Sequence, residues 1–389
     1  MLLALLLLTA GITLRQADRL HHAIRSPHAA GAAQLVALQR SRGNIVTPTL
    51  LLLGQWVQIT GWWLLAPYGV LGACAAAIGT AVQFRHLQEI SHHAVHGVLA
   101  PTRRSNDFLA EAFAHLPLGL AAASVRRKRH VRDHHPNATL AQDPNLLDLE
   151  RAGLRRGSPI TLLRFTAALL HPLSLAGVGA TAADLARALS RTGRLGPFLA
   201  VPAAAYLTAG WPGLLFGWLI PRLLLYPLLA WWSLVVEHTW FDPQPRTGQP
   251  VHVEGGRCLR LYPRNRALAL FAAATWLPYG DLRHYAHSVH PAVRWNYLPA
   301  LERHLPSPHF TPAAMCFGRG SLAQRHHQAL MASTSTGQAS EQYPGRGRRS
   351  TSTSSSAESL TLNRVSPTRE ARSMNASKSL RQPTLPNVN

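Results

Sequence analysis

Histidine is the residue type that gives this chain its capacity for chemistry. The 389 residues include 21 histidines against 17 acidic side chains, and eight of the histidines fall between His86 and His135. A soluble domain rarely needs so many imidazoles in one short stretch. Because imidazole is the commonest side-chain ligand for transition metals, this composition predicts a metal-binding protein.

Three short clusters contain most of the candidate ligands. In each cluster two histidines are three or four residues apart, so on a helix they share one face. The candidate metal ligands are His92, His96, His130, His134, His135, His238, His284, His287 and His290. One HxxxH pair alone is more often a solvated helix face than a site. So many imidazoles without thiolates suit iron, copper or zinc, and they exceed the needs of one metal, which predicts two ions.

Long apolar segments precede the first and third clusters. Residues 43–84 carry no charged side chain. A membrane span needs roughly 20 residues, so two spans fit if the chain reverses at Ala66-Pro67-Tyr68-Gly69, and a second pair fits around Gly210-Trp211-Pro212-Gly213. The predicted spans are about 45–65, 69–84, 195–210 and 214–236. The sequence thus predicts an all-α integral membrane protein, with four transmembrane helices in two hairpins and a helical cap that carries the histidine clusters.

The distribution of arginine predicts the orientation. Both hairpin turns lack Lys and Arg, whereas the segment between the hairpins contains the run Arg126-Arg127-Lys128-Arg129. Positive charge marks the cytoplasmic side, so we expect residues 85–194 and everything beyond 237 in the cytoplasm. All three clusters and both termini would then face the cytoplasm from the plasma (inner) membrane. The formal charge of +22 is attributed to this topology and to an arginine-rich composition rather than to nucleic-acid binding.

Composition divides the chain into three regions. Residues 1–42 form an N-terminal segment whose first 13 residues are apolar but too short to span a bilayer, which leaves an interfacial segment or a misassigned start as interpretations. Residues 43–317 form the membrane domain, in which 161–180 is apolar but interrupted by one arginine and one histidine, as in an interfacial or re-entrant helix. Residues 318–389 are rich in Ser, Thr and Arg, which predicts a disordered tail.

The clusters and their surroundings resemble the histidine boxes of the membrane fatty acid desaturase family, which includes hydroxylases and ketolases. HHAVHG with Asn106 downstream resembles the first box, and HVRDHHPNATLAQDPN resembles the second box with its trailing Asp143-Pro144. Glu237-His238 resembles an additional EH motif, and HYAHSVHPAVRWNYLPAL resembles the third box. The resemblance covers roughly residues 43–310 and implies that the candidate histidines hold two iron ions.

The third box departs from the family pattern. Where the family has two adjacent histidines, this chain has His287-Ser288, and His290 has no counterpart. On a helix that turns about 100° per residue, position 290 points away from the metals, but the following Pro291 disfavours helical geometry there. An extended backbone would let His290 replace the lost ligand, so it is included among the candidates.

The resemblance implies an O2-dependent oxidoreductase that acts on a lipid or fatty acyl chain, above all a desaturase, with a hydroxylase or ketolase as the alternative. Since the chain has no haem or flavin motif, electrons would come from a ferredoxin or similar small carrier on the arginine-rich cytoplasmic face. An inactive membrane scaffold, favoured by Ser288, and a metal-ion transporter are alternatives of other classes. Transport is disfavoured because the predicted spans hold no histidine and only one charged residue, Arg222.

Overall fold

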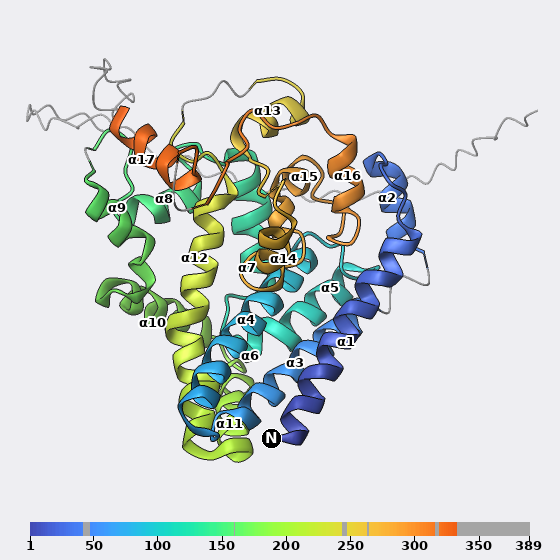
Figure 1. The fold of residues 1–389 in the computed structure, drawn as a ribbon, viewed down its shortest axis with the longest axis vertical. Helices are drawn as coiled ribbons and strands as arrows, with labels where there is room; N and C mark the ends of the chain where they lie inside the picture. Colours follow the sequence, from blue (N-terminus) through green and yellow to red (C-terminus); the bar gives the residue numbers. More distant parts are fainter. Residues whose placement is uncertain (42–46, 159, 243–246, 263, 316–318, 333–389) are drawn as a thin grey trace, which may run out of the picture. The chain divides into compact units, whose positions relative to one another are not determined.

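The computed structural model describes residues 1–41, 47–158, 160–242, 247–262, 264–315 and 319–332, which form helices and connecting turns (Figure 1). These ranges contain no β-strand, and only isolated β-bridges, such as the one between His238 and Cys258, join neighbouring segments. The predicted all-helical class is therefore confirmed for the part of the chain that the structure describes.

The helices differ widely in length. They are α1 (Leu2–Arg25), α2 (Ala32–Gln39), α3 (Thr47–Leu65), α4 (Gly69–Val95), α5 (Arg103–Ala110), α6 (Leu116–Leu118), α7 (Ala123–Arg127), α8 (Pro144–Arg151), α9 (Leu162–Leu169), α10 (Leu175–Leu189), α11 (Leu195–Leu214), α12 (Tyr226–Glu237), α13 (Pro250–Arg257), α14 (Arg266–Ala274), α15 (His284–Val289), α16 (Leu298–His304) and α17 (Leu322–Ala332). Wider π-helical turns are η2 (Glu111–His115), η3 (Lys128–His134), η6 (Leu215–Leu219) and η7 (Pro221–Leu225), and 3-10 turns are η4 (His135–Asn137), η5 (His171–Leu173) and η8 (Asp281–Arg283).

Two helices are long and apolar enough to cross a membrane. They are α4, of 27 residues, and the continuous helix Leu195–Glu237, of 43 residues, which includes α11 and α12. A third candidate is the pair Arg103–Leu118 and Ala123–Asn137, whose halves meet at a bend of 102°. By length and composition the described residues thus contain two membrane-crossing helices, or three if the bent pair is one span, where the sequence predicted four.

The long helix Leu195–Glu237 is folded back on itself. Its backbone leaves helical geometry at Ala209 (φ −145°, ψ 18°) and Gly210 (φ 62°, ψ −151°). The rings of Phe198 and Trp218 contact each other at 5.6 Å between centroids, although 20 residues of straight helix would separate them by about 30 Å. α11 therefore packs antiparallel to the segment that leads into α12, and the break lies at the predicted turn.

The N-terminal segment forms one helix, α1, that runs antiparallel along α3 (Figure 1). A Cβ added at Gly61 would lie 3.0 Å from the Ala4 carbonyl oxygen, and one added at Gly11 would lie 2.8 Å from the Gly54 carbonyl oxygen. Such close backbone approach needs small residues, as in packed membrane helices. Residues 1–13 are therefore part of a longer helix that packs along α3.

The course of α1 also corrects the predicted position of the N-terminus. The Met1 amino group contacts the Tyr68 hydroxyl, in the turn between α3 and α4. His92 lies 24 residues further along the chain, near the other end of α4, and therefore about 36 Å away along the helix axis. The N-terminus thus lies at the end of these helices opposite to the histidine clusters, whereas the sequence predicted both on one side.

The bent pair of helices, Arg103–Leu118 and Ala123–Asn137, lies between the first two histidine clusters, and its first half packs into the helical core. Leu109, Ala114 and Leu118 belong to the same buried cluster as Phe84 of α4. Gly119 (φ 61°) ends α6 in the left-handed conformation that glycine adopts without strain. The chain then comes back through α7 to η3, which carries the second histidine cluster.

The disordered tail was predicted to begin at residue 318, but residues Leu322–Ala332 form the helix α17. α17 is ordered because Leu322, His326 and Leu330 recur every four residues and bury one face of the helix. The His326 ring donates to the Val235 carbonyl oxygen at 3.0 Å. The rest of the predicted tail, from residue 333, lies outside the described residues.

Candidate metal centre

The end of α4 carries the first cluster. His92 and His96, four residues apart, point the same way, and their Nε2 atoms are 3.0 Å apart. His93 points elsewhere and donates to the Tyr279 carbonyl oxygen at 2.8 Å. The loop that follows is held by Asn106, whose Oδ1 accepts from the backbone N–H groups of Leu99 (2.9 Å) and Ala100 (3.0 Å). α4 therefore extends well beyond the predicted span 69–84 and presents its histidines from a rigid helix end.

The second cluster lies on a π-helix rather than an α-helix. The sequence predicted that His130 and His134 share a face, with His135 one step around. In η3 the turn is wider, because π-helical hydrogen bonds join residues five apart. His130 and His135, five apart, accordingly bring their Nε2 atoms to 3.1 Å, and His134 points to a different neighbour, His238. The cluster is thus divided between two sites.

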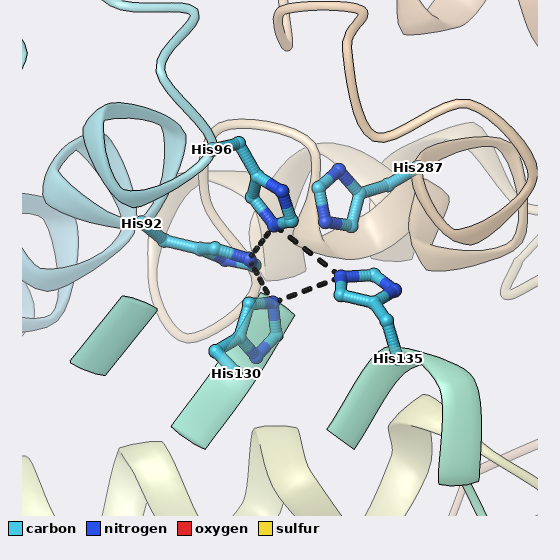
Figure 2. Close-up of side chains that lie close together, drawn as sticks. All are labelled: His92, His96, His130, His135 and His287. Atoms are coloured by element: carbon cyan, nitrogen blue, oxygen red, sulfur yellow. Dashed lines mark hydrogen bonds between the residues drawn. The ribbon is translucent and has the colours of Figure 1, made fainter. Parts of the chain in front are cut away.

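The first group gathers five imidazoles from three parts of the chain (Figure 2). Its members are His92, His96, His130, His135 and His287. Their Nε2 atoms converge, with 2.6 Å between His92 and His130 and 3.3 Å between His96 and His135. Two nitrogen ligands at about 2.1 Å from one metal and roughly 90–110° apart lie about 3.0–3.4 Å from each other. Most of the observed separations therefore match a shared metal ion.

The second group adds a carboxylate. Its members are His134, Glu237, His238 and His284, and in each of the two groups the ligand atoms lie within 4.8 Å of one another. The Nε2 atoms of His238 and His284 are 3.2 Å apart. Glu237 was not among the ligands predicted from the sequence, although a signal existed: it is the only acidic residue in the apolar helix that ends there, directly before His238.

Unpartnered ring nitrogens support the fit of both groups to metals. His134 Nε2 and both ring nitrogens of His287 are buried and have no hydrogen-bond partner among the described atoms. A buried polar atom without a partner is costly and therefore rare. A metal ion in each group would satisfy His134 Nε2 and one ring nitrogen of His287, which hydrogen bonds among the neighbouring imidazoles leave unpartnered.

The opposite ring nitrogens are held by protein acceptors. His92 Nδ1 donates to Glu89 Oε1 at 2.7 Å, and His134 Nδ1 donates to Asp143 Oδ1 at 2.9 Å. Such contacts fix the tautomer, so the Nε2 lone pair faces the site, and they orient the ring. Glu89 was not predicted as the partner of a ligand, although it is three residues before His92 and hence on the same helix face.

Burial keeps several of these imidazoles neutral. It lowers the pKa of His96, His284 and His287 well below the usual value, and neighbouring imidazoles lower these pKa values further. The rings are therefore unprotonated at neutral pH, which is the form that binds a metal.

One candidate, His290, is not brought to either group. Its backbone does leave helical geometry (φ −138°, ψ 76°), as expected before Pro291, while its N–H still donates to the Ala286 carbonyl oxygen at 3.1 Å. This conformation leaves the ring partly exposed and does not bring it into either group. Ser288, which stands where the family has a second histidine, is buried.

In the described residues the fold is helical, with helices of the membrane-spanning type and two histidine-rich groups that could each hold a metal ion. A family model described as fatty acid desaturase matches residues 60–313, which is more than half of the chain and includes every member of both groups. The chain therefore belongs to the fatty acid desaturase family. Searches of curated proteins and of solved structures found no match. The family supports a membrane di-iron oxidoreductase that acts on fatty acyl chains.

Proposed function

We propose that this protein is an O2-dependent fatty acid desaturase with two iron ions, one in each histidine group. The observation that carries the proposal is the convergence of eight imidazoles and one carboxylate into two adjoining groups. The groups adjoin because neighbouring residues, His134 and His135, contribute to different ones. When bound, the irons would supply the oxidising chemistry with O2 that removes hydrogen from an unactivated C–H bond.

The protein's own residues hold and shield the metals in this proposal. Five imidazoles would bind one ion, and three imidazoles with Glu237 would bind the other. Burial of His92, His238 and His287 excludes bulk water from much of the site. A protein nucleophile is not required. A hydroxylase or ketolase would use the same ligands, because the outcome depends on how the substrate carbon is presented.

Expression in a heterologous host with a reductase system tests the proposed activity. We expect new double bonds in the acyl chains of the host, and close to two irons per purified chain, because the groups supply ligands for two ions. A His238→Ala variant, which lacks one member of the second group, is the inactive control. A new hydroxyl or keto group would select the alternative activity. Zinc alone at full occupancy, or no metal after anaerobic iron loading, would contradict the di-iron proposal.

The electron donor in this proposal is a ferredoxin or similar small acidic carrier. Exposed arginines near the site support it: the side chains of Arg103, Arg132 and Arg151 are 74%, 77% and 73% exposed. Complementary charge accelerates encounter between electron-transfer partners, and salt weakens it. The proposal includes no nucleic-acid partner.

For topology we propose that the helical hairpins α3–α4 and α11–α12 supply the four predicted spans, and that α1, which runs antiparallel beside α3, is a fifth crossing. The apolar exposed side chains further along α1, including Leu6 and Ile12 (57% and 48% exposed), would face lipid. The histidine side would be cytoplasmic in the plasma (inner) membrane, in line with the arginines around η3. The N-terminus would lie on the opposite side, next to the α3–α4 turn.

Cysteine labelling in intact cells tests this topology. In a Cys74→Ser background, we expect an impermeant reagent to modify Trp211→Cys and Leu2→Cys from outside, since both positions are exposed at the turn end of the helices. Arg132→Cys should react only after the membrane is made permeable. Labelling of Arg132→Cys in intact cells would refute the orientation, and protection of Leu2→Cys alone would refute the position of the N-terminus.

A further inference from the structure

A buried network of charges lies behind the two metal groups. Its centre is Arg85, on α4 two turns before His92, with a side chain only 3% exposed. One guanidinium nitrogen, Nη1, donates to Glu89 Oε2 at 3.1 Å. The other, Nη2, donates to Asp281 and to the Ser233 hydroxyl, the latter at 2.9 Å.

One arm of this network reaches the first group. Glu89 uses Oε2 for Arg85 and Oε1 for His92 Nδ1, so both carboxylate oxygens have fixed partners. The orientation of the His92 ring therefore depends on a carboxylate that Arg85 holds in place. Outer contacts of this kind orient a metal ligand, and losing one typically lowers metal affinity by about 10–100-fold.

The other arm reaches the second group. Asp281 accepts from both Arg85 and the Ser233 hydroxyl, and it lies in η8, three residues before His284. Ser233 is one turn before Glu237 on α12, and its hydroxyl oxygen lies 3.5 Å from Glu237 Oε1. Because a hydroxyl has a single proton, Ser233 serves Asp281 and leaves the Glu237 carboxylate available to a metal.

Arg85 also balances buried negative charge. Glu89 and Asp281, which both accept from Arg85, are buried carboxylates, and buried carboxylates stay ionised only beside a cation or a metal. A guanidinium can bond two carboxylates at once through its planar fork, which a lysine ammonium cannot reproduce. Arg85 thus joins α4, α12 and the start of α15 in one hydrogen-bonded unit.

We propose that Arg85 is a positioning residue that couples the two metal groups: it fixes Glu89 behind His92 and Asp281 beside Ser233 and His284, so that its loss weakens metal binding at both. This inference rests on the proposed two-metal function. It predicts that removing the Glu89 or the Asp281 carboxylate weakens the binding of one ion, whereas removing Arg85 weakens the binding of both.

Anaerobic titration of purified protein with Co2+, followed by absorption and by metal content, tests the coupling. For Arg85→Gln we expect both dissociation constants to rise by about 10–100-fold, the usual effect of losing an outer contact of a ligand. Glu89→Gln should weaken mainly the first ion and Asp281→Asn mainly the second. Arg85→Lys should recover only part of the affinity. The matched control is Arg126→Gln, which removes another arginine near Glu89, one that donates to the Ser91 hydroxyl at 3.5 Å; its titration should match the wild type.

Several outcomes would overturn the inference. They are wild-type affinities in Arg85→Gln, loss of one ion only, or an equal loss in Arg126→Gln, which would indicate a general charge effect. If Arg85→Gln does not fold, the Glu89→Gln and Asp281→Asn pair decides, because coupling through Arg85 requires their effects to be non-additive and additive effects would refute it. A wild-type chain that binds fewer than two ions would instead refute the proposed function.

Discussion

His287→Ala should lower bound iron from about two ions per chain to about one and abolish oxidation of the substrate, because five converging imidazoles are the ligand set for one ion. His287 is buried, both of its ring nitrogens lack hydrogen-bond partners among the described atoms, and its ring lies 4.6 Å from that of His96 between centroids. Alanine offers no replacement donor at this position. Elemental analysis after anaerobic iron loading measures the change, with thermal unfolding as a check that the variant is folded.

The matched control for this variant is His290→Ala. His290 lies three residues further on, partly exposed and outside both groups, so its removal should leave iron content and turnover unchanged. Equal iron loss in the two variants would mean that His290 binds a metal after all, as the sequence first suggested. Full iron content in His287→Ala would instead exclude His287 from the metal site.

Glu237→Gln should selectively release the ion of the second group. Glu237 is the only carboxylate in that group, and glutamine keeps its size but removes the charge that balances a metal cation. Loss of a direct ligand should lower the affinity for this ion by at least roughly 100-fold, which is the upper end of the range for losing an outer contact of a ligand. Metal titration followed by spectroscopy would show one tight ion and one weak or absent ion, with no acyl oxidation.

Glu302→Gln is a suitable control for the charge change. Glu302 is a partly buried carboxylate that pairs with Arg260 at 3.4 Å and Arg283 at 3.5 Å, outside both groups. We expect it to retain both ions. Two tight ions in Glu237→Gln would show that the second group binds its metal through imidazoles alone.

The sequence by itself was sufficient for the helical class and for the eight histidines that the structure brings together in two groups; of the nine candidates, only His290 lies outside them. These follow from local properties: apolar runs of spanning length, turn residues such as Gly210, and histidines three or four apart at the ends of apolar segments. The N-terminal helix and α17 were misjudged. Composition does not reveal that a short apolar segment, or a Ser-rich region in which Leu322, His326 and Leu330 are four residues apart, can pack on distant helices.

Only the tertiary structure decided how the candidates are divided. The π-helical turn η3 sends His130 and His135 to one group and His134 to the other, which a spacing rule for α-helices cannot anticipate. Glu237 joins a group and His290 does not, because side-chain direction depends on local backbone angles. The contact of Arg85 with Asp281 spans 196 positions in the sequence. Such contacts arise from the packing of whole helices, so they cannot be predicted from the spacing of residues along the chain.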